Sequence, residues 1–307
     1  MPRPPAVAGA AHPDRGELRA AARAVGIREA AAGPTAHRRG FGLAGAGGSL
    51  GRMRLGERLN DGLSVFAVGE GPPLVTVPGL GRGADLSVRV PRSAALSTAA
   101  LARGFRRRVH LVHRPVRPPS GMTIAQLAGW YATALRERFG EPVDVWGTSG
   151  GGITALQLAL DHPGTVRRLV VTVAASRVDP HASRELLRVV RRGFSPSAAS
   201  RLIAHGPLRL LVLATFAVSS RKPREPGEVA LVEAVRGWDV TARLGELTVP
   251  VLLAGGTRDR LVPPDLLRAT AAGIPDARLV LLPGRGHLSV LYDGRLKPAV
   301  GAFLGAS

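Results

Sequence analysis

The chain of 307 residues contains no cysteine, few aromatic residues and almost no lysine. The absence of cysteine excludes disulfide frameworks, thiolate-bound zinc, iron–sulfur clusters and a thiol nucleophile. Aromatic residues make up 4% of the chain, and Lys222 and Lys297 are the only lysines among 42 basic residues. No apolar run approaches the roughly 20 residues that a membrane-spanning helix needs. We therefore expect no membrane span and a cytoplasmic location.

The charge is strongly positive, with a formal net value of +20 at pH 7. Residues 1–58 contain 10 basic and 4 acidic residues, and the remaining 249 contain 32 and 18, so the excess is spread along the chain. A nucleic-acid site usually combines clustered basic residues with aromatic stacking platforms. The basic cluster at residues 106–108 has no interleaved aromatic residue. The composition therefore argues against a specific nucleic-acid partner.

The composition divides the chain into three parts. Residues 1–53 are rich in alanine, arginine and glycine and offer few large apolar side chains, so we expect a disordered extension. Residues 54–178 and 247–307 alternate between strand-like and helix-like patterns. Residues 179–246 read as helical with no strand candidate, which predicts an inserted helical lid.

Strands and helices alternate along the two outer parts of the sequence. Apolar runs predict strands at residues 63–68, 74–77, 109–112, 143–146, 169–174, 249–254 and 279–282. Helical periodicity predicts helices at residues 94–103, 124–139, 153–160, 264–272 and 291–303. This alternation predicts an α/β fold with a mostly parallel sheet flanked by helices on both faces.

The strongest chemical signal is the Gly-Thr-Ser-Gly-Gly sequence at residues 147–151. It matches G-x-S-x-G, the sharp turn that exposes a nucleophilic serine between a strand and a helix. Glycine-rich sequences match this pattern by chance, but here a predicted strand leads directly into the turn and a predicted helix leaves it. We therefore predict Ser149 as the nucleophile.

A serine hydroxyl needs a base to take its proton and an acid to orient that base. In chain order the acid and then the histidine follow the serine. His287 lies in a glycine-rich loop after the last predicted strand, where open α/β sheets place their sites. Asp259 follows the preceding predicted strand, and Asp179 is the competing acid. The other histidines after Ser149 are placed at a helix end or in the predicted lid: His162, His181 and His205.

The negative charge that develops during acyl transfer needs two backbone N–H donors. One is predicted at Gly150, the residue after the nucleophile. The other is predicted at Leu80, in the Pro-Gly-Leu-Gly loop (residues 78–81) after an early strand. An ordinary Pro-Gly turn is the alternative interpretation of that loop.

Residues 54 to 304 resemble the α/β-hydrolase superfamily, and most closely its small bacterial esterase-like members. The resemblance rests on the oxyanion loop, the serine turn, residues 249–263 and the loop ending at His287. It implies a Ser-Asp-His triad and a mainly parallel eight-stranded sheet. The sequence departs from the family in having Pro78 where a histidine is common, and in a loop at residues 113–120 that lacks the usual Asp-x-Arg-Gly turn.

These features together predict a cofactor-free, metal-free serine hydrolase that cleaves a carboxylic ester or related acyl bond. Carbon–carbon bond hydrolysis and perhydrolysis are the alternatives with the same triad, and a catalytically silent binding protein is the alternative of another class. The expected partner is a small acyl substrate. Apolar side chains in the predicted lid suggest either an apolar pocket wall or the lid's own packing: Leu186, Leu187, Phe194, Leu210, Leu211 and Phe216.

Overall fold

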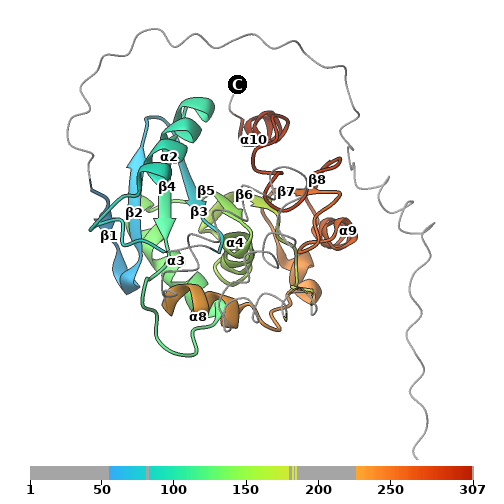
Figure 1. Cartoon of the computed structure of the whole chain (residues 1–307), viewed down its shortest axis with the longest axis horizontal. Helices are drawn as coiled ribbons and strands as arrows, with labels where there is room; N and C mark the ends of the chain where they lie inside the picture. The colour runs from blue at the N-terminus through green and yellow to red at the C-terminus, as the bar shows by residue number, and fades with distance from the viewer. Residues whose placement is uncertain (1–54, 81–82, 180–181, 183, 185–225, 306–307) are drawn as a thin grey trace, which may run out of the picture.

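The computed structural model describes residues 55–80, 83–179, 182, 184 and 226–305 (Figure 1). The predicted extension, residues 1–53, lies outside the described residues. So do His181, His205 and the six apolar side chains named for the predicted lid. The described residues include most of the two outer parts of the sequence. They also include the carboxyl-terminal end of the predicted lid, residues 226–246.

A single sheet of eight strands crosses the described part of the chain, in the order β1-β2-β4-β3-β5-β6-β7-β8. The strands are β1 (Glu57–Arg58), β2 (Ser64–Val68), β3 (Pro73–Val77), β4 (Arg108–His113), β5 (Val143–Thr148), β6 (Val166–Thr172), β7 (Val251–Gly256) and β8 (Ala277–Leu282). The β1–β2 and β2–β4 pairs are antiparallel, and the other pairs are parallel. The predicted mostly parallel α/β sheet is confirmed.

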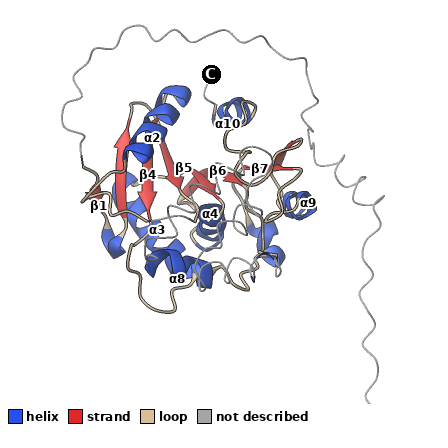
Figure 2. Cartoon of the chain, in the orientation of Figure 1, coloured by secondary structure: helices blue, strands red, loops and turns tan. Residues whose placement is uncertain are grey.

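Helices cover both faces of the sheet (Figure 2). On one face lie α2 (Arg92–Phe105) and α10 (Leu296–Leu304); on the other lie α3 (Ile124–Phe139), α4 (Gly150–Asp161) and α9 (Pro264–Gly273). Helix α8 (Pro226–Ala234) lies beyond α3 and α4, and two 3₁₀ turns are η1 (Asn60–Gly62) and η2 (Thr241–Glu246). Within the described ranges, no helix is both long and apolar enough to cross a bilayer.

Alternating side chains of β5 divide the core into its two layers. Val143 and Val145 join the apolar cluster beneath α3 and α4, whereas Trp146 joins the cluster beneath α2 and α10. The Trp146 ring meets Phe105 of α2 edge-on, with centroids 5.8 Å apart. A strand buried on both faces reads as a nearly continuous apolar run, which is why this strand is visible in the sequence.

The strand order places the loops that carry the candidate site residues at one edge of the sheet. From β3 the chain crosses to β4 on one side and then returns to β5 on the other. The loops after β3 and β5 therefore diverge at a switch point, where open α/β sheets leave a crevice. Leu80 and Ser149 follow these two strands, and Asp259 and His287 follow β7 and β8.

Several predicted elements differ from the structure in presence or extent, and three of these differences have a local cause. Strand β1 was missed because its two residues, Glu57 and Arg58, carry no apolar signal. The helix after the serine turn begins at Gly150, because three glycines at its start hide the helical period. The last helix begins at Leu296, since Asp293 accepts hydrogen bonds from its neighbours and holds the preceding residues in turns.

A buried ionic cluster lies at the opposite, amino-terminal edge of the sheet. The Asp144 carboxylate has no exposed surface and accepts from Arg107 Nη1 at 2.7 Å and from Arg167 Nη2 at 2.9 Å. Arg107 also donates to the Leu304 carbonyl, and Arg168 donates to the same oxygen at 2.7 Å. The cluster therefore fastens the end of α10 to the starts of β4 and β6.

Replacing Asp144 with alanine should lower the free energy of unfolding by about 3–5 kcal/mol, because it leaves the Arg107 guanidinium buried without its carboxylate. Urea unfolding measures this loss. The control is Asp265→Asn, whose exposed carboxylate pairs with Arg268 and should change stability by less than about 1 kcal/mol. Equal, small effects of both substitutions would contradict a stabilising role for the cluster.

Strand β4 contains two buried histidines, and we expect them to lower the free energy of unfolding in mild acid. His110 has no hydrogen-bond partner for Nδ1 in the described part of the chain, and His113 Nδ1 accepts from Ala84 N at 3.2 Å. Burial, helped by neighbouring arginines, lowers the pKa of His110 and of His113 to about 4. An unfolded histidine titrates near 6.5, so between about pH 6.5 and 4 the unfolded chain binds more protons.

The free energy of unfolding should therefore fall as pH falls through this window, by on the order of 2 kcal/mol per histidine. Urea midpoints at pH 7.0 and 4.5 measure the slope. His110→Leu keeps an apolar filling against Phe139 and removes one titrating group, so its slope should be shallower than the wild-type slope. Parallel slopes would refute the assignment.

Candidate active site

Ser149 occupies a strained turn between β5 and α4. Its φ of 52° and ψ of −122° are unfavourable for a residue with a side chain. The turn is closed so tightly that a Cβ on Gly147 would lie 2.5 Å from Gly151 O, and one on Gly151 would lie 2.1 Å from Val77 O. Only glycine fits at both positions, and the serine hydroxyl is left projecting above the sheet.

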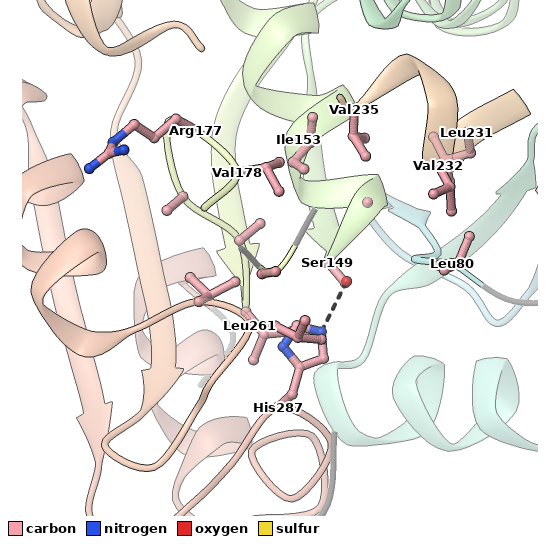
Figure 3. A pocket seen from close by; sticks show the side chains of 16 residues that line it. Leu80, Ser149, Ile153, Arg177, Val178, Leu231, Val232, Val235, Leu261 and His287 are labelled. Carbon is pink, nitrogen blue, oxygen red and sulfur yellow. Dashed lines mark hydrogen bonds between the residues drawn. The ribbon is translucent and has the colours of Figure 1, made fainter. Parts of the chain in front are cut away.

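His287 lies between Ser149 and Asp259. Its Nε2 is 3.0 Å from Ser149 Oγ, and its Nδ1 is 2.8 Å from Asp259 Oδ2 (Figure 3 draws the first of these contacts). The other carboxylate oxygen of Asp259 accepts from the backbone N–H groups of Leu261 at 2.9 Å and Val262 at 3.1 Å. These two bonds fix the carboxylate plane, and both His287 and Asp259 are buried.

The loops that carry Asp259 and His287 are joined directly to each other. Gly284 N donates to Thr257 Oγ1 at 2.8 Å, and Arg258 N donates to Arg285 O at 2.8 Å. The Arg285 side chain is held in turn by Asp293, at 2.6 Å. Hydrogen bonds from Arg295 and Arg285 hold the pKa of Asp293 well below its usual range, so this anchor is ionised at neutral pH.

The two predicted backbone donors lie close to each other beside Ser149. Gly150 is the first residue of α4, where backbone N–H groups have no partner within the helix. A Cβ built on Gly150 would lie 3.7 Å from Leu80 N, and one on Gly79 would lie 2.9 Å from Ser149 Cβ. Neither the Leu80 nor the Gly150 N–H donates to an acceptor in the described ranges.

The histidine and the aspartate that competed for the roles of base and acid make other contacts. His162 is the residue that ends α4, where its backbone N–H donates to Leu158 O. The Asp179 carboxylate accepts from Ala182 N at 3.0 Å, whereas the carboxylate that contacts His287 is that of Asp259. Among the residues described, no three histidine, aspartate or glutamate side chains gather as a metal-binding group.

An apolar pocket opens beside Ser149 and His287 (Figure 3). Helix α8 contributes Leu231 and Val232 to its wall, and the turn that follows the helix contributes Val235. The remaining described side chains of the wall are mostly aliphatic and come from the ends of β3, β6 and β7 and from α4: Leu80, Ile153, Val173, Ala174, Ala175, Val178, Ala182, Leu261 and Val262. Arg177 lines the edge, with its guanidinium directed away from Ser149.

The sequence profile of a family described as "alpha/beta hydrolase fold" matches residues 72–293. The chain belongs to this family. Its relatives include a Variovorax paradoxus protein named "Putative carbamate hydrolase RutD", 30% identical over 187 residues, which are 56% of this chain and 69% of the relative. A protein of the same name from Caulobacter vibrioides strain NA1000 is 31% identical over 161 residues, 48% of this chain and 60% of that relative.

Solved α/β-hydrolase structures superpose on most of the chain. A hydrolase from Pseudomonas aeruginosa PA01 has a TM-score of 0.68 at 25% identity, covering 84% of this chain and all of that one. The enol-lactonase of Burkholderia xenovorans LB400 has a TM-score of 0.63 at 23% identity, covering 81% and 99%, which is a likeness of fold. The expected fold family is confirmed, and this α/β-hydrolase is an enzyme of the hydrolase class.

Two parts of this α/β-hydrolase site were missed in the sequence. Arg114 lies in the loop noted only for lacking the family's usual turn, and its side chain donates to the Gly79 carbonyl in the loop after β3. The pocket side chains of α8 and the turn after it carry no chemical signal, because Leu231, Val232 and Val235 are indistinguishable from ordinary core residues until the helix is placed.

Proposed function

We propose that this α/β-hydrolase is a serine hydrolase that cleaves an ester or closely related acyl bond through an acyl-enzyme. One observation carries the proposal: His287 contacts Ser149 with one ring nitrogen and Asp259 with the other. That arrangement gives a serine nucleophile, a base and an orienting acid in the geometry that acyl transfer requires.

In the proposed reaction Ser149 Oγ attacks the carbonyl carbon while His287 Nε2 takes the hydroxyl proton. Asp259 accepts from Nδ1–H, which keeps the Nε2 lone pair directed at the serine and stabilises the imidazolium. The Leu80 and Gly150 N–H groups donate to the carbonyl oxygen as it gains negative charge. His287 then protonates the leaving oxygen, and water attacks the acyl-enzyme by the same route in reverse.

The pocket supports an apolar acyl group as substrate. Among the described residues, its wall is aliphatic apart from Arg177 and the reacting side chains Ser149 and His287. An apolar chain gains free energy by leaving water there, whereas a charged chain would lose hydration without a partner. Because two relatives are named as carbamate hydrolases, the same machinery acting on a carbamate is included in the test below.

We also propose that residues 179–246 are an insertion over this pocket. The chain just before the segment is bonded to the later part of it, since Arg177 and Asp239 form an antiparallel bridge and Val240 N donates to Ser176 O at 2.9 Å. Helix α8, inside the segment, already supplies part of the pocket wall. Removing residues 185–225 should therefore change chain-length preference more than it changes the unfolding temperature.

Two assays on the purified chain test the proposal. A fluorophosphonate should label Ser149, located by peptide mass spectrometry, because it reacts with activated serines. A series of p-nitrophenyl esters from acetate to palmitate, with a matched p-nitrophenyl carbamate, should then reveal acyl preference.

Absence of labelling at Ser149 together with absence of ester and carbamate turnover would refute the proposal and favour a silent binding protein. Turnover limited to a β-diketone, or to peroxide-dependent peracid formation, would instead select carbon–carbon bond hydrolysis or perhydrolysis.

A further inference from the structure

Arg114 is a buried cation at the carboxyl end of the sheet, directly after β4. Its residue is only 4% exposed, although guanidinium groups are rarely buried without a specific task. Nη1 donates to Gly79 O at 3.1 Å, and Nε donates to Gly227 O at 3.3 Å. One side chain therefore contacts both the oxyanion loop and the start of α8.

The carbonyl that Arg114 holds belongs to the same peptide group as the Leu80 N–H. The described chain contains no cis peptide bond, so the Gly79 C=O and the Leu80 N–H point in opposite directions across one rigid plane. Fixing the oxygen on one side of the plane fixes the N–H on the other. We infer that Arg114 is a positioning residue that orients and polarises the Gly79–Leu80 peptide as an oxyanion donor.

This peptide needs an external anchor because its first residue is glycine. Glycine permits backbone rotations that other residues resist, and rotation of this peptide would turn the Leu80 N–H away from Ser149. A side chain at position 79 cannot supply rigidity, since its Cβ would collide with Ser149 Cβ and Thr148 O, both at 2.9 Å. The bond from Arg114 supplies it from the far side of the peptide.

The charge of Arg114 adds a second effect. A hydrogen bond from a cation is stronger than one from a neutral donor, and it draws electron density toward the carbonyl oxygen it contacts. The N–H of the same amide thereby becomes a better donor. This effect grows with the negative charge on the substrate oxygen, so it favours the transition state over the bound ester.

The second hydrogen bond of Arg114, from Nε to Gly227 O, links the Gly79–Leu80 peptide to the pocket wall. Gly227 accepts from Arg114 and donates its own N–H to Val116 O at 2.9 Å, so the loop after β4 holds the first turn of α8. The same helix places Leu231 beside the nucleophile turn, with Cδ2 3.1 Å from the position of a Cβ on Gly150. Arg114 thus joins the wall that contacts the acyl group to the peptide that stabilises its oxygen.

This inference rests on the proposed function, and a trifluoromethyl ketone tests the two separately. Ser149 Oγ bonds to the ketone carbon, the carbonyl electron pair moves to oxygen, and the serine proton passes to His287. The adduct therefore carries the negative oxygen that the donors must bind. Wild-type enzyme that is neither inhibited by the ketone nor labelled by fluorophosphonate would refute the proposed function itself.

With wild-type inhibition established, Arg114→Met should raise the Ki of the ketone and lower kcat by the same factor, about 10- to 100-fold, with a smaller change in KM. Complete loss of an oxyanion donor costs about 10²–10³-fold, and here the donor is weakened but kept. Each rate is normalised to active sites by fluorophosphonate titration, which removes the effect of misfolded protein.

Arg107→Met is the matched control, because it removes a buried arginine from the opposite edge of the sheet. It should lower the unfolding temperature and leave kcat and the ketone Ki per active site unchanged. Arg114→Gln is the second variant, since its amide nitrogen corresponds in position to Arg114 Nε, so it can keep the bond to Gly227 O and preserve folding while it removes the Nη1 contact with Gly79 O. It should show a loss of the same size as Arg114→Met, about 10- to 100-fold. An unchanged Ki and kcat in Arg114→Gln, or equal losses in Arg107→Met, would overturn the inference.

Discussion

Ser149→Ala should lower ester turnover by at least about 10³-fold and abolish fluorophosphonate labelling. The substitution removes only the hydroxyl, and no other group can form the acyl-enzyme. The residual rate should be that of water attack assisted by the backbone donors. Steady-state kcat on the preferred p-nitrophenyl ester measures the loss, after the variant has been shown to unfold at the wild-type temperature.

Ser97→Ala is the control for this experiment. Ser97 lies on the exposed side of α2, where its hydroxyl donates to Ala94 O. Its removal should leave both turnover and labelling unchanged. Near-wild-type activity in purified Ser149→Ala would end the proposed mechanism.

Asp259→Asn should lower kcat by about 10²- to 10⁴-fold with little change in shape. The asparagine amide turns an N–H donor toward His287 Nδ1, which favours the tautomer whose proton is on Nε2. Nε2 then cannot accept the Ser149 proton. The backbone bonds from Leu261 and Val262 to the other oxygen can persist, so folding should be preserved.

Asp179→Asn separates the two candidate acids. Because the Asp179 carboxylate caps Ala182 N, its substitution should change kcat by less than about threefold. If Asp179→Asn proves the more damaging of the two, the acid has been assigned to the wrong strand end.

The parts of the fold that the sequence predicted are those with strong local signals. Buried strands such as β5 and β7 are largely apolar, with Asp144 the one charged residue of β5, and the glycines around Ser149 are demanded by contacts closer than any side chain permits. The same logic selected Asp259 and His287, because loops that follow parallel strands share one edge of the sheet. Spacing and strand order therefore sufficed to bring the candidate site residues together.

The parts that could not be predicted depend on contacts between distant segments. Arg114 contacts Gly79 and Gly227, which are 35 and 113 residues away, and nothing in the local sequence indicates either partner. Tertiary hydrogen bonds of this kind leave no periodic pattern in the sequence.

The ionic cluster at Asp144 also determines how the enzyme can be attached to a solid support. Arg107 and Arg168 hold the last carbonyl of α10 at the amino-terminal edge of the sheet, whereas Ser149 and His287 occupy the carboxyl edge. A biotin acceptor peptide joined after Gly305, the last described residue, would therefore begin on the side away from the pocket. Enzyme immobilised on streptavidin beads through that peptide would present its pocket to the bulk solution.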